Sequence, residues 1–166
     1  MIRILVSACL LGERVRHHGG HAACEHPVLV RWQREGRLIP FCPEVAGGLP
    51  TPRLAAEVVG GDGPAVLTGA ARVLDVSRQD VTERFLSGAR AGLGVAAAND
   101  VRLAILKDGS PSCGSTFVHD GTFSGVHRKG QGVTAALLSG AGIRVFGELE
   151  IEAAAACLAA LEASPS

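Results

Sequence analysis

The sequence lacks a net charge of either sign, a long hydrophobic run and any closely spaced pair of cysteines. Sixteen Lys and Arg residues balance sixteen Asp and Glu residues, so the 166-residue chain carries no overall field that would attract a nucleic acid. No run of about 18 uncharged apolar residues is present, which excludes a transmembrane helix. We therefore expect neither a membrane nor a large nucleic acid as partner.

A secretory signal is also missing at the N-terminus. Val6-Ser7-Ala8-Cys9 resembles a lipoprotein cleavage site, but only five residues precede Val6, too few for the charged and apolar regions of a signal. The five cysteines are odd in number and scattered, which fits a reducing compartment better than a disulfide framework. The sequence predicts a cytoplasmic protein whose thiols are free or metal-bound.

Hydrophobic residues make up 47% of the chain and charged residues 19%, enough apolar content for one well-packed core. Short apolar runs typical of buried parallel strands alternate with longer helical patterns. The predicted strands are 2–6, 38–41, 103–106 and 143–146, and the predicted helices are 27–35, 77–98, 130–140 and 150–162. We predict a single α/β domain over residues 1–166, with a small Rossmann-like parallel sheet flanked by helices.

Other segments are less regular. Residues 55–59 and 71–76 favour short edge strands or a hairpin. Residues 116–126 alternate around Asp120-Gly121, which favours a small hairpin or an irregular excursion. Ser77 and Asp80 have the spacing of a capping box, which predicts that the long helix begins at Ser77.

Cys9, Cys42 and Cys113 each lie just past the carboxyl end of a predicted strand. Because those ends meet at one edge of a parallel sheet, three thiols distant in sequence could meet at one site. Thiolates select zinc, copper(I) or iron–sulfur clusters. Three thiolates would bind three irons of a 4Fe-4S cluster and leave the fourth open for chemistry.

The same three cysteines could instead be small buried hydrophobes, although their Pro-, Ser- and Gly-rich neighbours favour a metal site. Cys157 lies among alanines and is expected in the core. Cys24 lies close to several histidines, which form either a solvated loop or a zinc site whose spacing fits no standard finger.

Blocks of distinctive residues follow one another along nearly the whole chain. They are Ser7-Ala8-Cys9-Leu10-Leu11-Gly12 with Arg16 and Gly19; Cys42-Pro43-Glu44 with Gly47-Gly48-Leu49-Pro50-Thr51-Pro52-Arg53 and Glu57; Leu106-Lys107 with Ser110-Pro111-Ser112-Cys113-Gly114 and Asp120-Gly121-Thr122-Phe123-Ser124-Gly125; and Gly130-Gln131-Gly132-Val133-Thr134-Ala135. With these blocks in this order, the chain resembles the TudS-type thiouracil desulfidases.

The resemblance implies a 4Fe-4S cluster held by Cys9, Cys42 and Cys113, whose open iron binds the sulfur of a thiolated pyrimidine. It further implies conversion of thiouracil-type pyrimidines to uracil with release of hydrogen sulfide. One departure is His17 after Arg16, where the family carries Tyr in an Arg-Tyr-Asp-Gly form. The chain also lacks an additional domain found in some relatives, so the expected substrate is a small thiolated base or nucleotide.

Replacing C=S by C=O needs a thiophilic Lewis acid, an activated water and a partner for the ring. Glu44, two residues after a cluster cysteine, is the candidate general base; alternatively it caps a helix N-terminus. Ser110 and Ser112 flank the proline of the loop that presents Cys113. One hydroxyl, for which we favour Ser110, would orient water or the ring, while the other belongs to the turn.

Positive groups near these motifs could bind the substrate. Arg53 and the glycine-rich loop before it could bind an anion, or Arg53 could pair with Glu57. Lys107 could stabilise cluster charge or be a surface lysine. The Gly130-Gln131-Gly132 segment before a helix offers a second, weakly indicated anion site.

Two other functions stay open on the residues alone. A non-catalytic module could hold the cluster or a zinc ion as a redox or metal sensor, and a cytosolic thiol protein would hold neither. Iron and sulfide analysis separates the second from the others, and consumption of thiouracil separates the enzyme from the sensor.

Overall fold

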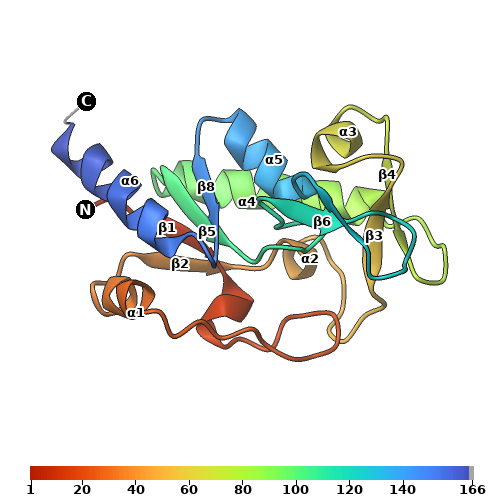
Figure 1. Cartoon of the computed structure of the whole chain (residues 1–166), viewed down its shortest axis with the longest axis horizontal. Coiled ribbons are helices and arrows are strands. Elements are labelled where there is room, and N and C mark those ends of the chain that lie inside the picture. The colour runs from red at the N-terminus through yellow and green to blue at the C-terminus, as the bar shows by residue number, and fades with distance from the viewer. Residues whose placement is uncertain (165–166) are drawn as a thin grey trace.

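Four short apolar segments form the central sheet. The computed structural model describes residues 1–164, and its central strands are β1 (Ile4–Ser7), β2 (Leu38–Phe41), β5 (Leu103–Leu106) and β8 (Arg144–Gly147). They lie in the order β2-β1-β5-β8 and are all parallel (Figure 1). Strands β1 and β5 are buried along their whole length, as central strands covered on both faces should be. The predicted parallel sheet is therefore confirmed; residues 165 and 166 of the predicted domain lie outside the described part.

Helices cover both faces of this sheet, and they are α1 (Pro27–Arg34), α4 (Thr82–Ala98), α5 (Val133–Gly140) and α6 (Ile151–Ala163). Ile4 and Val6 pack in one core cluster with residues of α1 and α6, whereas Leu5 packs in another with residues of α4 and α5. The alternation of side chains along β1 thus builds a three-layer α/β domain, as predicted. Within residues 1–164, no helix has the length and hydropathy needed to cross a membrane.

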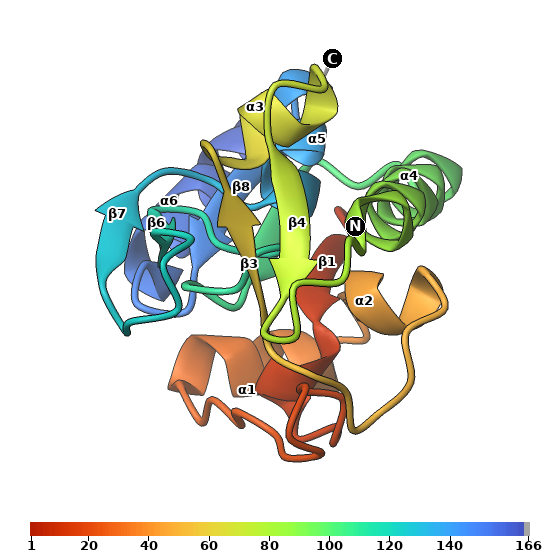
Figure 2. The same ribbon diagram turned by 90° about the vertical axis from the view of Figure 1, so that its right-hand side faces the viewer.

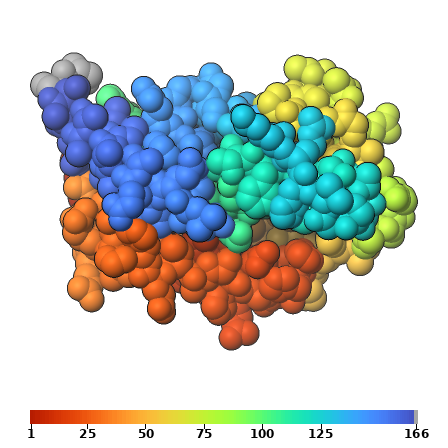
Figure 3. Space-filling view, viewed as in Figure 1, coloured from red at the N-terminus to blue at the C-terminus, as the bar shows by residue number. Residues whose placement is uncertain are grey.

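Two antiparallel hairpins form separate two-stranded sheets at one end of the molecule (Figure 2). Strands β3 (Ala56–Val59) and β4 (Arg72–Asp75) form the first, and β6 (Phe117–His119) and β7 (His127–Lys129) form the second. The first agrees with the predicted edge strands or hairpin, whereas the second extends beyond the predicted range 116–126, because its second strand lies at 127–129. In the space-filling view, the N-terminal segment covers the lower part of one face and the segment around β6 lies directly above it (Figure 3).

Three short helical elements were not predicted. They are the 3₁₀ turn η1 (Ala8–Leu11) and the helices α2 (Pro43–Ala46) and α3 (Gly63–Leu67). Each has five residues or fewer, so no periodic pattern can reveal it. Two of them, η1 and α2, directly follow the central strands β1 and β2 and carry Cys9 and Glu44.

The predicted start of the long helix is wrong. Helix α4 begins at Thr82, not at Ser77. The Asp75 carboxylate accepts hydrogen bonds from the backbone N–H groups of Ser77 and Gln79, which forms a tight turn at the end of β4. Asp80 accepts the Thr82 N–H, so Asp80 supports the entry to the helix rather than its first turn.

The backbones of helices α2 and α4 come into close contact at two glycines. A Cβ atom added at Gly88 would lie 1.9 Å from the Pro43 carbonyl oxygen, and one added at Gly47 would lie 2.0 Å from the Arg84 carbonyl oxygen. No side chain fits between the two backbones. This contact fixes the short helix that carries Glu44 against the longest helix of the fold.

Gly88→Ala should therefore lower the free energy of unfolding by about 1–3 kcal/mol, the usual cost of overpacking. Gly94→Ala is the matched control on the same helix, because a Cβ there meets nothing within 4 Å. The control should be neutral or stabilise by about 0.5–1 kcal/mol through helix propensity. Urea unfolding measures both, and equal stability of the two variants would contradict the close contact of α2 and α4.

Candidate active site

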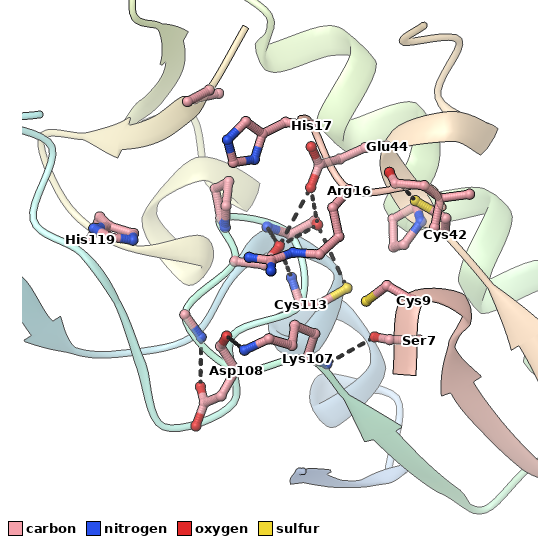
Figure 4. A pocket seen from close by; sticks show the side chains of 18 of the residues that line it. Ser7, Cys9, Arg16, His17, Cys42, Glu44, Lys107, Asp108, Cys113 and His119 are labelled. Atoms are coloured by element: carbon pink, nitrogen blue, oxygen red, sulfur yellow. Dashed lines mark hydrogen bonds between the residues drawn. The ribbon is translucent and has the colours of Figure 1, made fainter. Parts of the chain in front are cut away.

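The carboxyl ends of β1, β2 and β5 open onto a cavity of about 450 Å³ (Figure 4). It is lined by the predicted cluster ligands and by the catalytic and substrate-binding candidates: Cys9, Cys42, Glu44, Arg53, Lys107, Ser110, Ser112 and Cys113. Its walls come from the loops after three parallel strands and from the two hairpins. A cavity at this edge is where α/β sheets bind ligands.

The three strand-end cysteines share this cavity. Cys9 lies in η1 directly after β1, Cys42 precedes the first residue of α2, and Cys113 lies in the loop between β5 and β6. Figure 4 shows their sulfur atoms on one side of the pocket. The structure thus brings together three thiols that are 33 and 71 residues apart in the sequence.

Burial controls the protonation of these thiols. It raises the pKa of Cys9 to about 11 and that of Cys113 to about 12. Burial also raises the pKa of Cys42, although the backbone N–H groups at the start of α2 oppose it. Without a bound cation the thiols are neutral at physiological pH, so binding of a metal must release protons.

The donor set fits an iron–sulfur cluster. Within residues 1–164, no three His, Cys, Asp or Glu side chains are close enough to hold a single metal ion. Thiolates are the ligands that iron–sulfur clusters take, and three cysteines share this cavity. Arg16 and Lys107 act to lower the pKa of Cys9, so positive charge is already present to offset that of the thiolates.

Glu44 is held from both sides. Arg53 Nε donates to its Oε1 at 3.0 Å and the Ser112 hydroxyl donates to its Oε2 at 2.9 Å, while the Ser110 Oγ lies 3.4 Å from the same oxygen. Its side chain is 15% exposed. The alternative that Glu44 caps a helix is wrong, because Cys42 is the N-cap of α2 and no side chain caps it.

The two serines occupy different environments. Their hydroxyls hydrogen-bond each other at 2.9 Å. Both border the cavity, but Ser112 is buried and Ser110 is partly exposed. The Ser110 Oγ accepts the backbone N–H groups of Ser112 and Cys113 at 3.2 Å each. The serine pair therefore connects the Glu44 carboxylate to the loop that presents Cys113.

Arg53 does not pair with Glu57. Besides Glu44, its guanidinium donates to the Val15 carbonyl at 2.7 Å and to the Pro50 carbonyl at 3.1 Å. The glycine-rich loop before Arg53 is also occupied, since its N–H groups bond to carbonyls of α2. These backbone N–H groups are therefore not free to bind the anion that was predicted at this loop.

Lys107 borders the cavity and is 24% exposed. Its Nζ lies 2.7 Å from Glu148 Oε1 and donates to the Asp108 carbonyl at 3.0 Å. The interpretation of Lys107 as an ordinary surface lysine is wrong. Its charge lies beside the thiols but is shared with Glu148.

Sequence reasoning missed Asp108. Its Oδ1 accepts the backbone N–H groups of Gly109, Ser115, Thr116 and Phe117, and the Thr116 hydroxyl donates to its other oxygen. Burial acts to raise the pKa of Asp108, but these hydrogen bonds outweigh burial and hold the pKa below its usual range. One carboxylate thus closes the loop that carries Ser110, Ser112 and Cys113.

The start of α5 supports the same loop. The N–H groups of Gly132, Val133 and Thr134 donate to the carbonyls of Gly114, Pro111 and Ser112 at 2.8–2.9 Å. The predicted anion site there is wrong, because the loop carbonyls take these donors. The helix begins at Val133 rather than Gly130.

Aromatic residues of the second hairpin were also missed. Phe117, His119 and His127 line the cavity, and the Phe117 and His127 rings stack at a centroid distance of 4.6 Å. His17, which replaces the expected Tyr, lines the cavity too, and burial together with His18 lowers its pKa. The alternation of Phe117 and His119 along β6 is the sequence signal that could have revealed two of them.

Cys24 and Cys157 lie elsewhere. Both are partly buried against the core cluster that α1 and α6 form with the sheet, and neither lines the cavity. His26 accepts the Val28 N–H and so caps α1, and its other ring nitrogen lies 3.2 Å from Glu152. The zinc site considered for this loop finds no support in residues 1–164.

Comparison with known proteins agrees with this geometry. A family model of 2-thiouracil desulfurases matches residues 4–150, a span that includes every cavity residue. The chain is 47% identical over 148 residues to the uncharacterized protein YbbK of Bacillus subtilis, covering 89% of this chain and 97% of YbbK. It also resembles the solved structure of the [4Fe-4S]-dependent thiouracil desulfidase TudS, with a TM-score of 0.87 and 44% identity over 96% of this chain and 99% of that one. The chain therefore belongs to the 2-thiouracil desulfurase family.

Proposed function

We propose that the protein is an iron–sulfur-dependent desulfidase that converts a thiolated pyrimidine such as 2-thiouracil to uracil and releases hydrogen sulfide. The reaction consumes one water: its oxygen replaces sulfur on the ring carbon, and its two protons leave with the sulfur. No oxidant or reductant is needed. The observation that carries the proposal is one cavity holding three buried thiols beside a carboxylate fixed by Arg53 and two serines.

Cys9, Cys42 and Cys113 would hold a [4Fe-4S] cluster through three of its irons, as the similarity to TudS supports. When bound, a cluster with an open iron supplies a thiophilic Lewis acid that polarises the carbon–sulfur bond. Ser7 and Ser112 act to lower the pKa of Cys113 by hydrogen bonding, and Arg16 and Lys107 do so for Cys9 by charge. These groups would stabilise the deprotonated thiols that a cluster requires.

Glu44 is the general base. Arg53 holds Oε1, so Oε2, which the serine hydroxyls face, is the atom that takes a proton from the attacking water. The same oxygen then returns the proton to the departing sulfur. Because Arg53 is almost buried and fixed by the Val15 and Pro50 carbonyls, it orients the carboxylate rather than the substrate.

Ser110 orients the water or the ring, and Ser112 positions Glu44. Both serines border the cavity, but Ser112 is buried and donates to the carboxylate at 2.9 Å, whereas Ser110 is partly exposed and lies 3.4 Å from it. Lys107, held by Glu148, offsets negative charge beside the thiols. The more exposed and more weakly bound Ser110 hydroxyl is therefore the one that would turn to the reactants.

Turnover fits the cavity better than a role as a metal or redox sensor. A sensor needs ligands for its metal, but it has no use for a carboxylate held between a guanidinium and two hydroxyls beside an open cavity. All five cysteines are free thiols, which supports a reducing compartment such as the cytoplasm. The substrate is a small molecule, because the cavity rather than a charged outer surface holds the reactive groups.

Replacing any one of the three cavity cysteines should abolish cluster loading. After anaerobic reconstitution with iron and sulfide, Cys9→Ser, Cys42→Ser and Cys113→Ser should lose iron, its absorbance near 400 nm and thiouracil consumption. Cys24→Ser and Cys157→Ser are matched controls, because these thiols lie outside the cavity. Iron analysis measures the outcome, and loss of iron in Cys24→Ser would contradict the ligand assignment.

Glu44→Gln should keep full iron content and desulfurate thiouracil at least about a hundredfold more slowly, because a positioned general base contributes about 10²- to 10⁴-fold. The amide keeps the size of the side chain but removes its basicity. Glu83→Gln, an exposed change on α4, is the control and should match the parent. The decrease in thiouracil absorbance gives the rates, and parent-like turnover by an iron-loaded Glu44→Gln protein would eliminate Glu44 as the base.

A further inference from the structure

A further carboxylate, besides Glu44 and Asp108, borders the same cavity and is buried. Glu57 lies in the middle of β3 and is 8% exposed. Its Oε1 accepts the backbone N–H groups of Gly121 at 3.0 Å and Phe123 at 3.2 Å. Its Oε2 takes no hydrogen bond from any residue in the described range 1–164.

The free oxygen is accessible from the cavity, because Glu57 lines the cavity and Oε2 is not among the fully buried, unpartnered side-chain atoms of residues 1–164. A ligand in the cavity can therefore reach it. The neighbouring turn cannot shift to satisfy it, because a Cβ at Gly121 would lie 2.5 Å from the Val58 carbonyl oxygen. With Oε1 tied to this turn, Oε2 has a fixed position at the cavity wall.

The surroundings of Glu57 suit a flat ring. Phe117 and His127 stack in the same cavity, and the His119 Nδ1 is buried without a hydrogen-bond partner in residues 1–164. In Figure 4, His119 lies on the side of the pocket away from the sulfur atoms of Cys9 and Cys42. The cavity thus has a sulfur-bearing side and a second side with aromatic surface and unsatisfied polar atoms.

We propose that Glu57 Oε2 accepts a hydrogen bond from a ring N–H of the thiolated pyrimidine and thereby selects thiolactam substrates, in which an N–H adjoins the C=S carbon. This inference rests on the proposed function and deepens it. Glu44 has a different role, because Arg53 holds its Oε1 and its Oε2 takes the proton of the attacking water. Glu57 recognises the ring, whereas Glu44 activates the water.

A site built around a buried acceptor rejects substrates that lack the matching donor. Methylation of the recognised nitrogen removes the donor and places a methyl group against the carboxylate. The parent protein should therefore discriminate by at least about tenfold in kcat/KM between 2-thiouracil and one of its two N-methyl isomers.

The test compares the parent protein with Glu57→Gln, both fully loaded with iron, on 2-thiouracil and on its N1-methyl and N3-methyl derivatives. The Gln side chain keeps an acceptor for the Gly121 and Phe123 N–H groups but presents an NH₂ donor in place of Oε2. We expect kcat/KM for 2-thiouracil to fall by about 10- to 100-fold, mainly through KM, and the discrimination against the methylated isomer to disappear. Calorimetric binding of uracil, which keeps both ring N–H groups and is not turned over, should weaken in parallel.

Arg78→Ala is the matched control. Arg78 stacks on the Phe123 ring at 4.7 Å, so its loss loosens the same turn without changing the Glu57 oxygen, and it should leave the selectivity intact. Parent-like kinetics of Glu57→Gln, or an equal loss in Arg78→Ala, would overturn the inference while the desulfidase assignment stands. Absence of thiouracil turnover by the iron-loaded parent would instead overturn the proposed function, and this inference with it.

Discussion

Parallel pairing of β1 with both β2 and β5 is the constraint on which the site depends. It brings the chain out of three strands at one edge, where the next residues carry Cys9, Cys42 and Cys113. The Lys107 N–H donates to the Ser7 hydroxyl at 2.9 Å, which ties the ends of β1 and β5 together beyond the last paired residues. The separation of the cysteines in sequence is therefore unimportant to their meeting in space.

Hydrogen bonds from backbone and carboxylate groups fix the short loops that carry the reactive residues. Asp108 gathers the loop after β5, the start of α5 binds its carbonyls, and the glycine contact with α4 fixes α2. Each of these groups acts on a different segment of the site. The cavity is consequently shaped before any ligand binds, which lowers the cost of ordering it during the reaction.

The sequence predicted the parts of the molecule that follow from periodicity and topology. The bounds of β2 and β5 agree with prediction because both are short apolar runs flanked by turn residues. The predicted start of α4 was wrong. Ser77 and Asp80 have the spacing of a capping box, but Asp75 accepts the Ser77 N–H in a turn, and the helix begins only at Thr82. Spacing alone does not reveal which of several carboxylates reaches a given N–H.

The same limit applies to the site. That the strand-end cysteines and Glu44 share a cavity could be anticipated, because strand ends and chain proximity fix their positions. The partner of Arg53 and the exposed oxygen of Glu57 could not, because both depend on loops that cross from distant parts of the sequence. Asp108 was missed for the same reason, because its partners lie up to nine residues further along the loop.

The central claim is that water replaces sulfur on the ring with no change of oxidation state. Iron-loaded protein, 2-thiouracil and H₂¹⁸O, combined without oxygen or reductant, test it most directly by mass spectrometry of the uracil together with sulfide analysis. The account predicts one ¹⁸O atom in each uracil formed and one sulfide released for each. Uracil without the label, or uracil formed without release of sulfide, would contradict it.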